Sequence, residues 1–423
     1  MADIKQLAKM LNELDELVTR CMSCGMCQAQ CPVFTQSGKE TDVTRGKLAL
    51  ISGLRREMLK DPKQVQEKLN RCLLCGTCEA NCPSGVQVTD IMLRARAILN
   101  EYLGMSTTQK LLFRRMLTHP RLMNTLVSLG ARFQGLFSKQ ADEIIGTSCA
   151  RFNAPFIRDR HFRAFAKKPL HKQVPSLDTP AGSSGLRVAF FPGCVTDKIF
   201  PGVGQAVLKI LAHHQVGVYM PRGQACCGIP ALSAGESDAF SGLVRQNVEL
   251  FSAGNWDYLV TPCATCTATM RQLWPEHHKG SMGRIITDNI LDINQFLVDI
   301  LGVKPAPGDG EKIPVAFHDP CHLRNTLKIS SQPRDIIAAS KGYAVAELPG
   351  GPSCCGSGGS FNLKHYDLSR EIGLAKARDI ADSGAAMAAT ACPACMLQLA
   401  DMMSQEKISL PVKHVLEIYA ESL

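Results

Sequence analysis

Nineteen cysteines in 423 residues constrain this chain more than any other feature. The first twenty residues are interrupted by charged side chains and contain no apolar signal-peptide core, so we expect a reducing, cytosolic compartment. In that compartment, this many cysteines indicate metal ligation rather than disulfides. Eighteen of them fall into four groups, and only Cys149 stands apart; we interpret it as structural or incidental.

The composition indicates a globular protein of two to three domains. Apolar residues make up 45% of the chain and charged residues 20%, which excludes a disordered or fibrous protein. The longest uncharged stretches are short or broken by Gly, Pro and polar residues, so we expect no membrane span.

The first two cysteine groups are CMSCGMCQAQCP and CLLCGTCEANCP. Both have the CxxCxxCxxxCP spacing of bacterial ferredoxins, in which three cysteines bind one cubane cluster and the fourth binds the other cluster. The spacing therefore predicts two [4Fe-4S] clusters. One would be bound by Cys21, Cys24, Cys27 and Cys82, and the other by Cys72, Cys75, Cys78 and Cys31. Two zinc sites are the alternative, but zinc knuckles usually lack the third close cysteine and the CP ending.

Helical periodicity dominates the rest of this region. About forty residues separate the two runs, and apolar steps of three and four predict helices over 45–60 and 61–72. A third helix is predicted over 89–103, with Thr89 or Asp90 as its cap and an end near Gly104. The sequence thus predicts an all-α ferredoxin domain.

The second half of the chain is an internal duplication. Short β-rich runs alternate there with helical stretches, which predicts α/β units with parallel strands. The cysteines recur at offsets of 127, 128 and 129 residues, with similar flanking residues. The first set is Cys194, Cys226, Cys227, Cys263 and Cys266, and the second is Cys321, Cys354, Cys355, Cys392 and Cys395. Gly228 and Gly356 follow the two cysteine pairs, where the backbone can approach a bulky inorganic group. Two more metal clusters are predicted; zinc in one lobe or a redox disulfide is the alternative.

Taken together, these motifs resemble the iron-sulfur subunit of glycolate oxidase. The wider family includes the D subunit of heterodisulfide reductase and the lactate-utilisation iron-sulfur proteins, and the resemblance covers nearly the whole chain. It implies an α-helical bis-[4Fe-4S] ferredoxin domain followed by two duplicated α/β cysteine-rich (CCG) domains. It also implies that the ten later cysteines bind one or two non-cubane [4Fe-4S] clusters. We expect a ferredoxin domain over 1–103, a basic helical connector and linker over 104–186, a first lobe over 187–305 and a second lobe over 306–423.

Two weaker signals concern cofactors and cluster surroundings. The stretch PGVGQAV at 201–207 lacks the third glycine and the acidic residue of a dinucleotide loop, so we interpret it as the start of a helix. Nothing in the chain resembles a flavin or nicotinamide site. If the chain serves a hydroxy acid dehydrogenase, as the resemblance implies, the step that accepts the hydride therefore belongs on another polypeptide. His318 and His322 flank Cys321, and we predict that they support its cluster from outside the ligand set.

The formal net charge of +9 is concentrated in the connector, where residues 104–186 hold thirteen Lys and Arg against four Asp and Glu. Its amphipathic stretch favours binding to an anionic membrane surface or to an acidic partner protein. The alternative is that its helices only pack over the ferredoxin domain. No fold or aromatic platform for nucleic acid accompanies the charge.

The family resemblance implies an iron-sulfur electron-transfer subunit of a flavin-dependent 2-hydroxy acid dehydrogenase. A partner FAD subunit would oxidise glycolate or D-lactate, and electrons would pass toward a quinone, a membrane redox protein or another non-oxygen acceptor. We expect a cytoplasmic protein, with the inner face of the cytoplasmic membrane as a place of peripheral attachment. The alternatives are a heterodisulfide-reductase-like thiol-disulfide oxidoreductase with catalytic lobes, and a redox-sensing scaffold.

Overall fold

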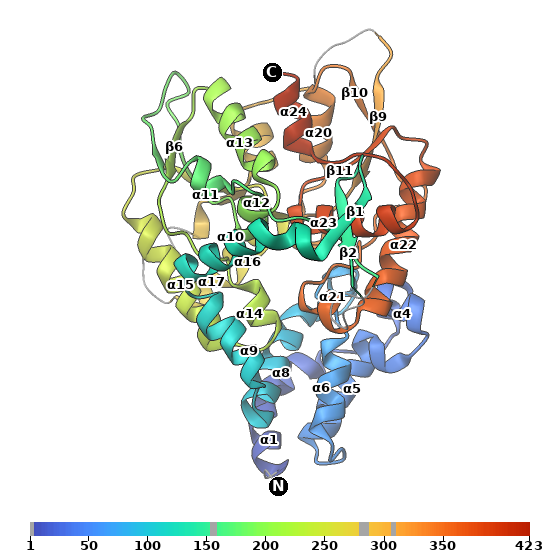
Figure 1. Cartoon of the computed structure of the whole chain (residues 1–423). Helices are drawn as coiled ribbons and strands as arrows, with labels where there is room; N and C mark the ends of the chain where they lie inside the picture. The colour runs from blue at the N-terminus through green and yellow to red at the C-terminus, as the bar shows by residue number, and fades with distance from the viewer. Residues whose placement is uncertain (1–3, 153–158, 279–286, 306–309) are drawn as a thin grey trace. The chain divides into compact units, whose positions relative to one another are not determined.

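The chain forms two compact units in the computed structural model, which describes residues 4–152, 159–278, 287–305 and 310–423 (Figure 1). Unit 1 comprises Met1–Arg115, Ile229–Phe240 and Gly356–Gly373, and unit 2 comprises Met116–Gly228, Ser241–Cys355 and Leu374–Leu423. Unit 1 therefore consists of the ferredoxin-like region and one short segment from each lobe. The domain boundaries expected from sequence stay a prediction, and residue 306, where the second lobe would begin, lies outside the described residues.

Unit 1 is helical. Its main helices are α1 (Ile4–Leu11), α5 (Thr44–Arg55), α6 (Pro62–Asn70) and α8 (Val88–Leu103). The shorter ones are η1 (Asn12–Leu14), α2 (Asp15–Thr19), α3 (Met26–Gln30), α4 (Pro32–Ser37), η2 (Glu40–Asp42), α7 (Thr77–Ala80), α9 (Thr107–Lys110), α14 (Ile229–Ser233) and α21 (Ser360–Lys364). The core of α1, α5, α6 and α8 is aliphatic, with Leu11, Leu54, Leu69 and Leu99 fully buried. Helices α5, α6 and α8 lie where the periodicity predicts helices, although α5 ends at Arg55 and not at residue 60.

The start of α8 differs from the sequence prediction. Thr89 and Asp90 lie inside the first turn and not at the cap, because the helix begins at Val88 after Gln87, whose side chain makes no capping bond. The Glu79 carboxylate of α7 accepts a hydrogen bond from the Thr89 backbone N–H at 2.9 Å. A side chain from another helix thus satisfies one of the free donors, which a local cap pattern cannot reveal. Gly104 ends the helix with φ of 76°, as predicted.

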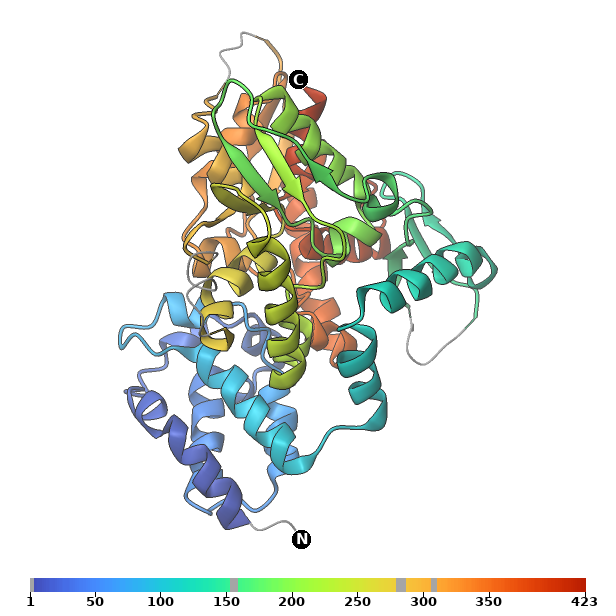
Figure 2. The ribbon, with the colours of Figure 1, turned by 90° about the vertical axis from the view of Figure 1, so that its left-hand side faces the viewer.

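Unit 2 holds two mainly parallel sheets, one per lobe (Figure 2). The first has the order β4-β6-β5-β7-β8, with only β4 antiparallel, and the second has the order β10-β9-β11-β12. The strands are β4 (Leu177–Asp178), β5 (Arg187–Phe190), β6 (Gly217–Met220), β7 (Tyr258–Thr261), β8 (Ile290–Asp292), β9 (Ile313–His318), β10 (Tyr343–Ala346), β11 (Met387–Thr390) and β12 (Val412–His414). The predicted α/β character of both lobes is confirmed.

Unit 2 also contains the helices α11 (Leu170–Gln173), α12 (Cys194–Lys198), α13 (Pro201–His213), α16 (Ala264–Gln272), α17 (Trp274–His277), α19 (Ile293–Gln295), η4 (Phe296–Ile300), η5 (His322–Thr326), α20 (Ser331–Ala339), α23 (Pro393–Gln405) and α24 (Val415–Glu421). Of these, α13, α16, α20, α23 and α24 pack against strands of the two sheets, as buried parallel strands require. The chain passes between the units within η3 (Leu111–Met116), α15 (Ser237–Ser252) and α22 (Tyr366–Asp382). The PGVGQAV stretch forms the start of α13 with Pro201 in its first turn, as interpreted from sequence.

The connector is helical over most of residues 107–137 and again in α11, but strands lie between these helices, so the prediction of a helical segment is met only in part. After α10 (Pro120–Phe137) the chain forms an antiparallel sheet of β1 (Ser138–Asp142), β2 (Thr147–Ala150) and β3 (His161–Arg163) (Figure 2). The turn between β1 and β2 is fixed by the Asp142 carboxylate, which accepts the Ile145 N–H, and by Gly146 with φ of 73°. Cys149 lies on β2, remote in sequence from the cysteine groups. No helix among the described residues is long and apolar enough to cross a membrane.

Candidate metal centres

The two ferredoxin-like runs fold into matching loops. Gly25 and Gly76 precede the short helices α3 and α7 with φ of 85° and 68°, and Ser23 and Leu74, two residues earlier, also have positive φ. In each run, one left-handed residue stands before the second cysteine and one stands after it. These two residues turn the backbone, so that the successive thiols of the run face the same cavity. Glycine is the residue type expected in this conformation, whereas Ser23 and Leu74 carry no such signal in the sequence.

The eight cysteines gather around two cavities in unit 1. One cavity is lined by Cys21, Cys24, Cys27 and Cys82, and the other by Cys31, Cys72, Cys75 and Cys78. Cys78 also reaches the wall of the first cavity. Each group combines three thiols of one run with the last thiol of the other, which is the donor set that a cubane cluster takes. The ligand assignment made from spacing is compatible with this grouping and is carried forward as a proposal.

The second cavity has a buried, cationic wall. Burial raises the pKa of the Cys31 thiol to about 11, so a metal must displace the proton of this thiol on binding. Lys47 is 2% exposed, lines the same cavity and donates to the Asp42 carbonyl. A fixed ammonium beside thiolates compensates negative charge, which suits an anionic iron-sulfur group.

Arg96 fixes the loop that carries Cys72. This arginine is 2% exposed and donates to the carbonyls of Leu69, Cys72 and Ser233 at 2.7, 2.7 and 2.9 Å. Ser233 ends α14, five residues after the glycine of the first cysteine pair. One side chain therefore joins the Cys72 loop to a segment of the first lobe.

The second lobe reaches the same loop. Leu73 packs so closely on Gly358 that a Cβ at this glycine would lie 2.5 Å from the Leu73 Cδ2 atom. Gly358 follows Cys355 by three residues. The Cys72 loop thus contacts the two chain segments that follow the cysteine pairs of the two lobes.

In the first lobe, the five cysteines stand after the carboxyl ends of three neighbouring parallel strands. Cys194 follows β5, Cys226 and Cys227 follow β6, and Cys263 and Cys266 follow β7. Parallel strands end at one edge of a sheet, and the thiols meet there. The Sγ atoms of Cys194 and Cys226 are 3.9 Å apart.

The first-lobe backbone leaves room for a group among these thiols. Gly193 has φ of 79°, and a Cβ at this position would lie 3.3 Å from the Cys266 Sγ atom. Asn247 accepts a hydrogen bond from the Ala225 N–H and donates to the Cys226 carbonyl, while Trp274 donates to the Cys227 carbonyl. No sequence pattern predicts that Asn247 and Trp274 support these cysteines; only the scarcity of tryptophan, with two in the chain, gives a signal for one of them.

The second lobe repeats the arrangement. Cys321 follows β9, Cys354 and Cys355 follow β10, and Cys392 and Cys395 follow β11. The Sγ atoms of Cys321 and Cys354 are 4.0 Å apart, and those of Cys263 and Cys392 are also 4.0 Å apart. The two quintets therefore adjoin through equivalent cysteines inside unit 2.

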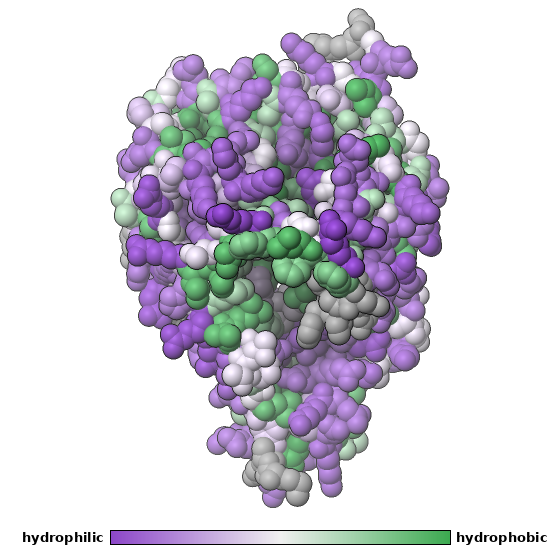
Figure 3. All heavy atoms as spheres, viewed as in Figure 1, coloured by the Kyte–Doolittle hydropathy of each residue, from purple (hydrophilic) through white to green (hydrophobic). Residues whose placement is uncertain are grey.

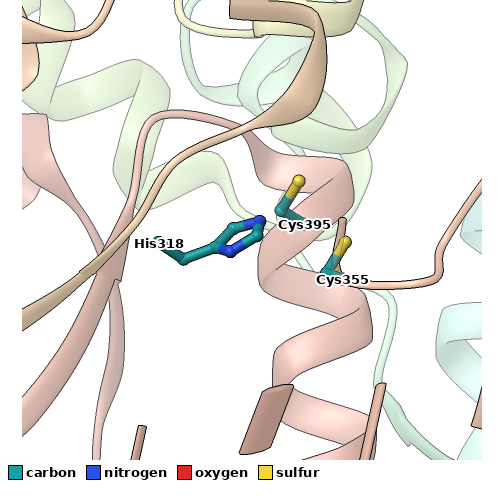
Figure 4. Close-up of side chains that lie close together, drawn as sticks. All are labelled: His318, Cys355 and Cys395. Carbon is teal, nitrogen blue, oxygen red and sulfur yellow. The ribbon is translucent and has the colours of Figure 1, made fainter. Parts of the chain in front are cut away.

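His318 distinguishes the second lobe from the first. A ring nitrogen of His318 and the Sγ atoms of Cys355 and Cys395 lie within 4.8 Å of one another, and Figure 4 shows the ring directed toward both cysteines. Burial lowers the pKa of His318 to about 4, and the Nε2 atom has no hydrogen-bond partner among the described residues. The equivalent first-lobe residue is Phe191. His322 lies further out, with Nδ1 3.0 Å from the Thr265 hydroxyl.

The thiol groups fall in a dicluster domain and in two duplicated cysteine-rich domains, as the comparison with family models shows. Residues 17–86 match the 4Fe-4S dicluster domain, and residues 188–271 and 315–400 each match the cysteine-rich CCG domain. The N-terminal dicluster domain and the two CCG domains predicted from sequence are thereby confirmed.

Three proteins of similar sequence indicate which kind of iron-sulfur protein this chain resembles. The chain is 28% identical to a probable glycolate oxidase iron-sulfur subunit of Bacillus subtilis, over 98% of this chain and 97% of the relative. It is 28% identical to the B subunit of the fumarate reductase (CoM/CoB) of Methanothermobacter marburgensis, over 94% of this chain and 71% of the relative. It is 29% identical to lactate utilization protein A of Oceanobacillus iheyensis, over 56% of this chain and 96% of the relative. The resemblance to the glycolate oxidase iron-sulfur subunit and the lactate-utilisation proteins is confirmed.

Proposed function

We propose that this chain is the electron-transfer subunit of a flavin-dependent 2-hydroxy acid dehydrogenase. A partner FAD subunit would oxidise glycolate or D-lactate, and the electrons would continue toward a quinone or another non-oxygen acceptor. The names of the relatives support an oxidoreductase subunit. The cytoplasm is the proposed compartment.

Four thiol groups support the proposal. Cys21, Cys24, Cys27 and Cys82 would hold one cubane cluster, and Cys31, Cys72, Cys75 and Cys78 the second. The quintets Cys194, Cys226, Cys227, Cys263, Cys266 and Cys321, Cys354, Cys355, Cys392, Cys395 would hold non-cubane clusters, with zinc in one lobe as the alternative. When bound, such clusters supply one-electron steps that divide a two-electron oxidation.

The Cys72 loop is the observation that carries the proposal. Arg96 and Leu73 hold it against the segments that follow the cysteine pairs of the two lobes. The dicluster loop and two chain segments that continue from the cysteine pairs of the lobes thus pack together in one unit. This shared packing supports a function in electron relay between the dicluster domain and the lobes.

A second candidate function is reductive cleavage of a disulfide at the first lobe. Cys194 and Cys226 line a cavity of about 550 Å³ in unit 2, which is large enough to admit a small organic molecule. Pull-down from the native source distinguishes the two functions. The first requires a flavoprotein partner, whereas a haem protein without a flavoprotein would favour the second.

The proposal is tested by anaerobic purification with iron, sulfide and zinc analysis and electron paramagnetic resonance (EPR). We expect about sixteen iron atoms per chain, no zinc, and reduction of the clusters by glycolate or D-lactate when the flavoprotein is present. About eight iron atoms with zinc would restrict electron transfer to the dicluster domain. Cys31→Ser should remove the cluster of the Cys72 run, while the matched control Cys149→Ser should leave the iron content unchanged.

A further inference from the structure

Among the residues that the structure describes, the connector carries most of the exposed large hydrophobic side chains. Eleven of the eighteen in the described residues lie between residues 111 and 165. Six of them are on α10, with exposed fractions from 43% to 65%: Leu122, Leu126, Leu129, Phe133, Leu136 and Phe137. In Figure 3 a band of hydrophobic residues crosses the face at the position of α10. A patch of this kind on a monomer indicates an interaction surface.

These six side chains form one stripe, which we call the α10 stripe. At 100° per residue they fall within an arc of about 100° around the helix. The opposite side of α10 carries Val127 and Ala131, each 6% exposed. Gln134 fixes the helix by exchanging two hydrogen bonds, of 3.0 and 2.9 Å, with the Phe165 backbone. The helix is thus anchored by one face and presents the other.

The charges around the stripe indicate what covers it. Helix α10 has no acidic residue, and Arg121 and Arg132 lie on the same flank of the stripe, about 60° or less beyond its edge. Lys139 follows on β1. Long cationic side chains beside an apolar stripe can reach lipid phosphates while the apolar side chains enter the acyl boundary. A flat, single-helix stripe with cations on its flank fits an anionic bilayer better than the concave face of a protein.

We propose that the α10 stripe docks this protein on the surface of an anionic lipid bilayer. The first turn of α10, with Pro120 and Arg121, also lines the cavity that reaches Cys194 and Cys226. The docked helix therefore borders the route to the first-lobe thiols, where a lipid-soluble acceptor would meet the protein. This last step rests on the proposed function, whereas the docking itself does not.

The docking is tested by sedimentation of the purified holoprotein with vesicles of phosphatidylcholine alone or with phosphatidylglycerol. We expect binding to the anionic vesicles that weakens with salt. The double variant L129E/L136E should bind at least about tenfold more weakly, and Arg121→Gln about fivefold more weakly. The matched control Leu363→Glu changes an equally apolar side chain that is 72% exposed on α21, and it should bind as the unaltered protein does.

Failure of the docking and failure of the proposed function give different results. Iron content and EPR spectra of each variant show whether the centres are intact, independently of vesicle binding. No binding of the unaltered protein to anionic vesicles, or equal loss in Leu363→Glu, overturns the docking. The same applies if L129E/L136E binds vesicles normally but no longer co-purifies with its flavoprotein, because the stripe would then be a protein interface.

Discussion

Removal of the Arg96 side chain should release the Cys72 loop. Arg96→Ala leaves the carbonyls of Leu69, Cys72 and Ser233 buried without their donor. Hydrogen bonds to a charged group contribute about 1.5–3 kcal/mol each, but losses at one side chain are not additive. A destabilisation of unit 1 by about 3–5 kcal/mol is therefore expected, and the opening equilibrium should rise at least about hundredfold, since each 1.4 kcal/mol corresponds to a factor of ten.

The assay is the anaerobic loss of visible iron-sulfur absorption in moderate urea, where cluster loss follows the population of the opened unit. Arg94→Ala is the matched control, because Arg94 is exposed and its 2.6 Å ion pair with Asp90 contributes only about 0.3–0.5 kcal/mol. It should accelerate the loss about twofold. Arg96→Lys should be intermediate, since one ammonium cannot reach three carbonyls. Equal rates for Arg96→Ala and Arg94→Ala would refute the reasoning.

Three further changes test individual features. His318→Phe gives the second lobe the aromatic residue that Phe191 provides in the first; the EPR signal of the second lobe should change and that of the first should not, and identical spectra would contradict a contribution of His318. Gly193→Ala brings a Cβ within 3.3 Å of the Cys266 Sγ atom at a φ of 79°, so the iron content should fall by about four atoms, and an unchanged content would show that the loop relaxes. Burial and nearby cations lower the pKa of His365 to about 4 from a usual value near 6.5, so the neutral form stabilises the folded unit above about pH 6.5 and this stability is lost as the pH falls toward 4. The urea midpoint should decrease between about pH 7.5 and 5.5, and less so in His365→Gln; parallel profiles would count against this assignment.

Repeated spacing made the cysteine groups predictable. A ligand loop depends on a few neighbouring residues, so CxxCxxCxxxCP predicts which thiols meet, and the structure gathers Cys82 with Cys21 and Cys31 with Cys72. The duplicated lobes were similarly visible, because each cysteine follows a short apolar strand. Local spacing and internal repetition can both be recognised in a single sequence, so these features were predictable.

The supports of the site were not predictable because they act over long separations. Arg96 lies 137 residues from Ser233, and its helical position resembles that of any surface arginine. Glu79 accepts a hydrogen bond at the start of α8 from another helix, whereas the local sequence pattern points to Thr89 or Asp90 as the cap. The sheet of β1, β2 and β3 escaped detection because its strands are short and mostly half-buried, without the alternation that marks a buried face.

The division of unit 1 into three chain segments has a consequence for biogenesis. Its last segment, Gly356–Gly373, leaves the ribosome more than two hundred residues after Arg115. At typical synthesis rates, roughly 10–50 s pass between synthesis of the first eight cysteines and synthesis of the last segment of unit 1, which contains them. During that interval the nascent thiols stay accessible to an iron-sulfur carrier. Maturation of all the centres is thereby expected to converge near the end of translation, and a chain truncated before residue 373 should fail to retain the clusters of its own N-terminal region.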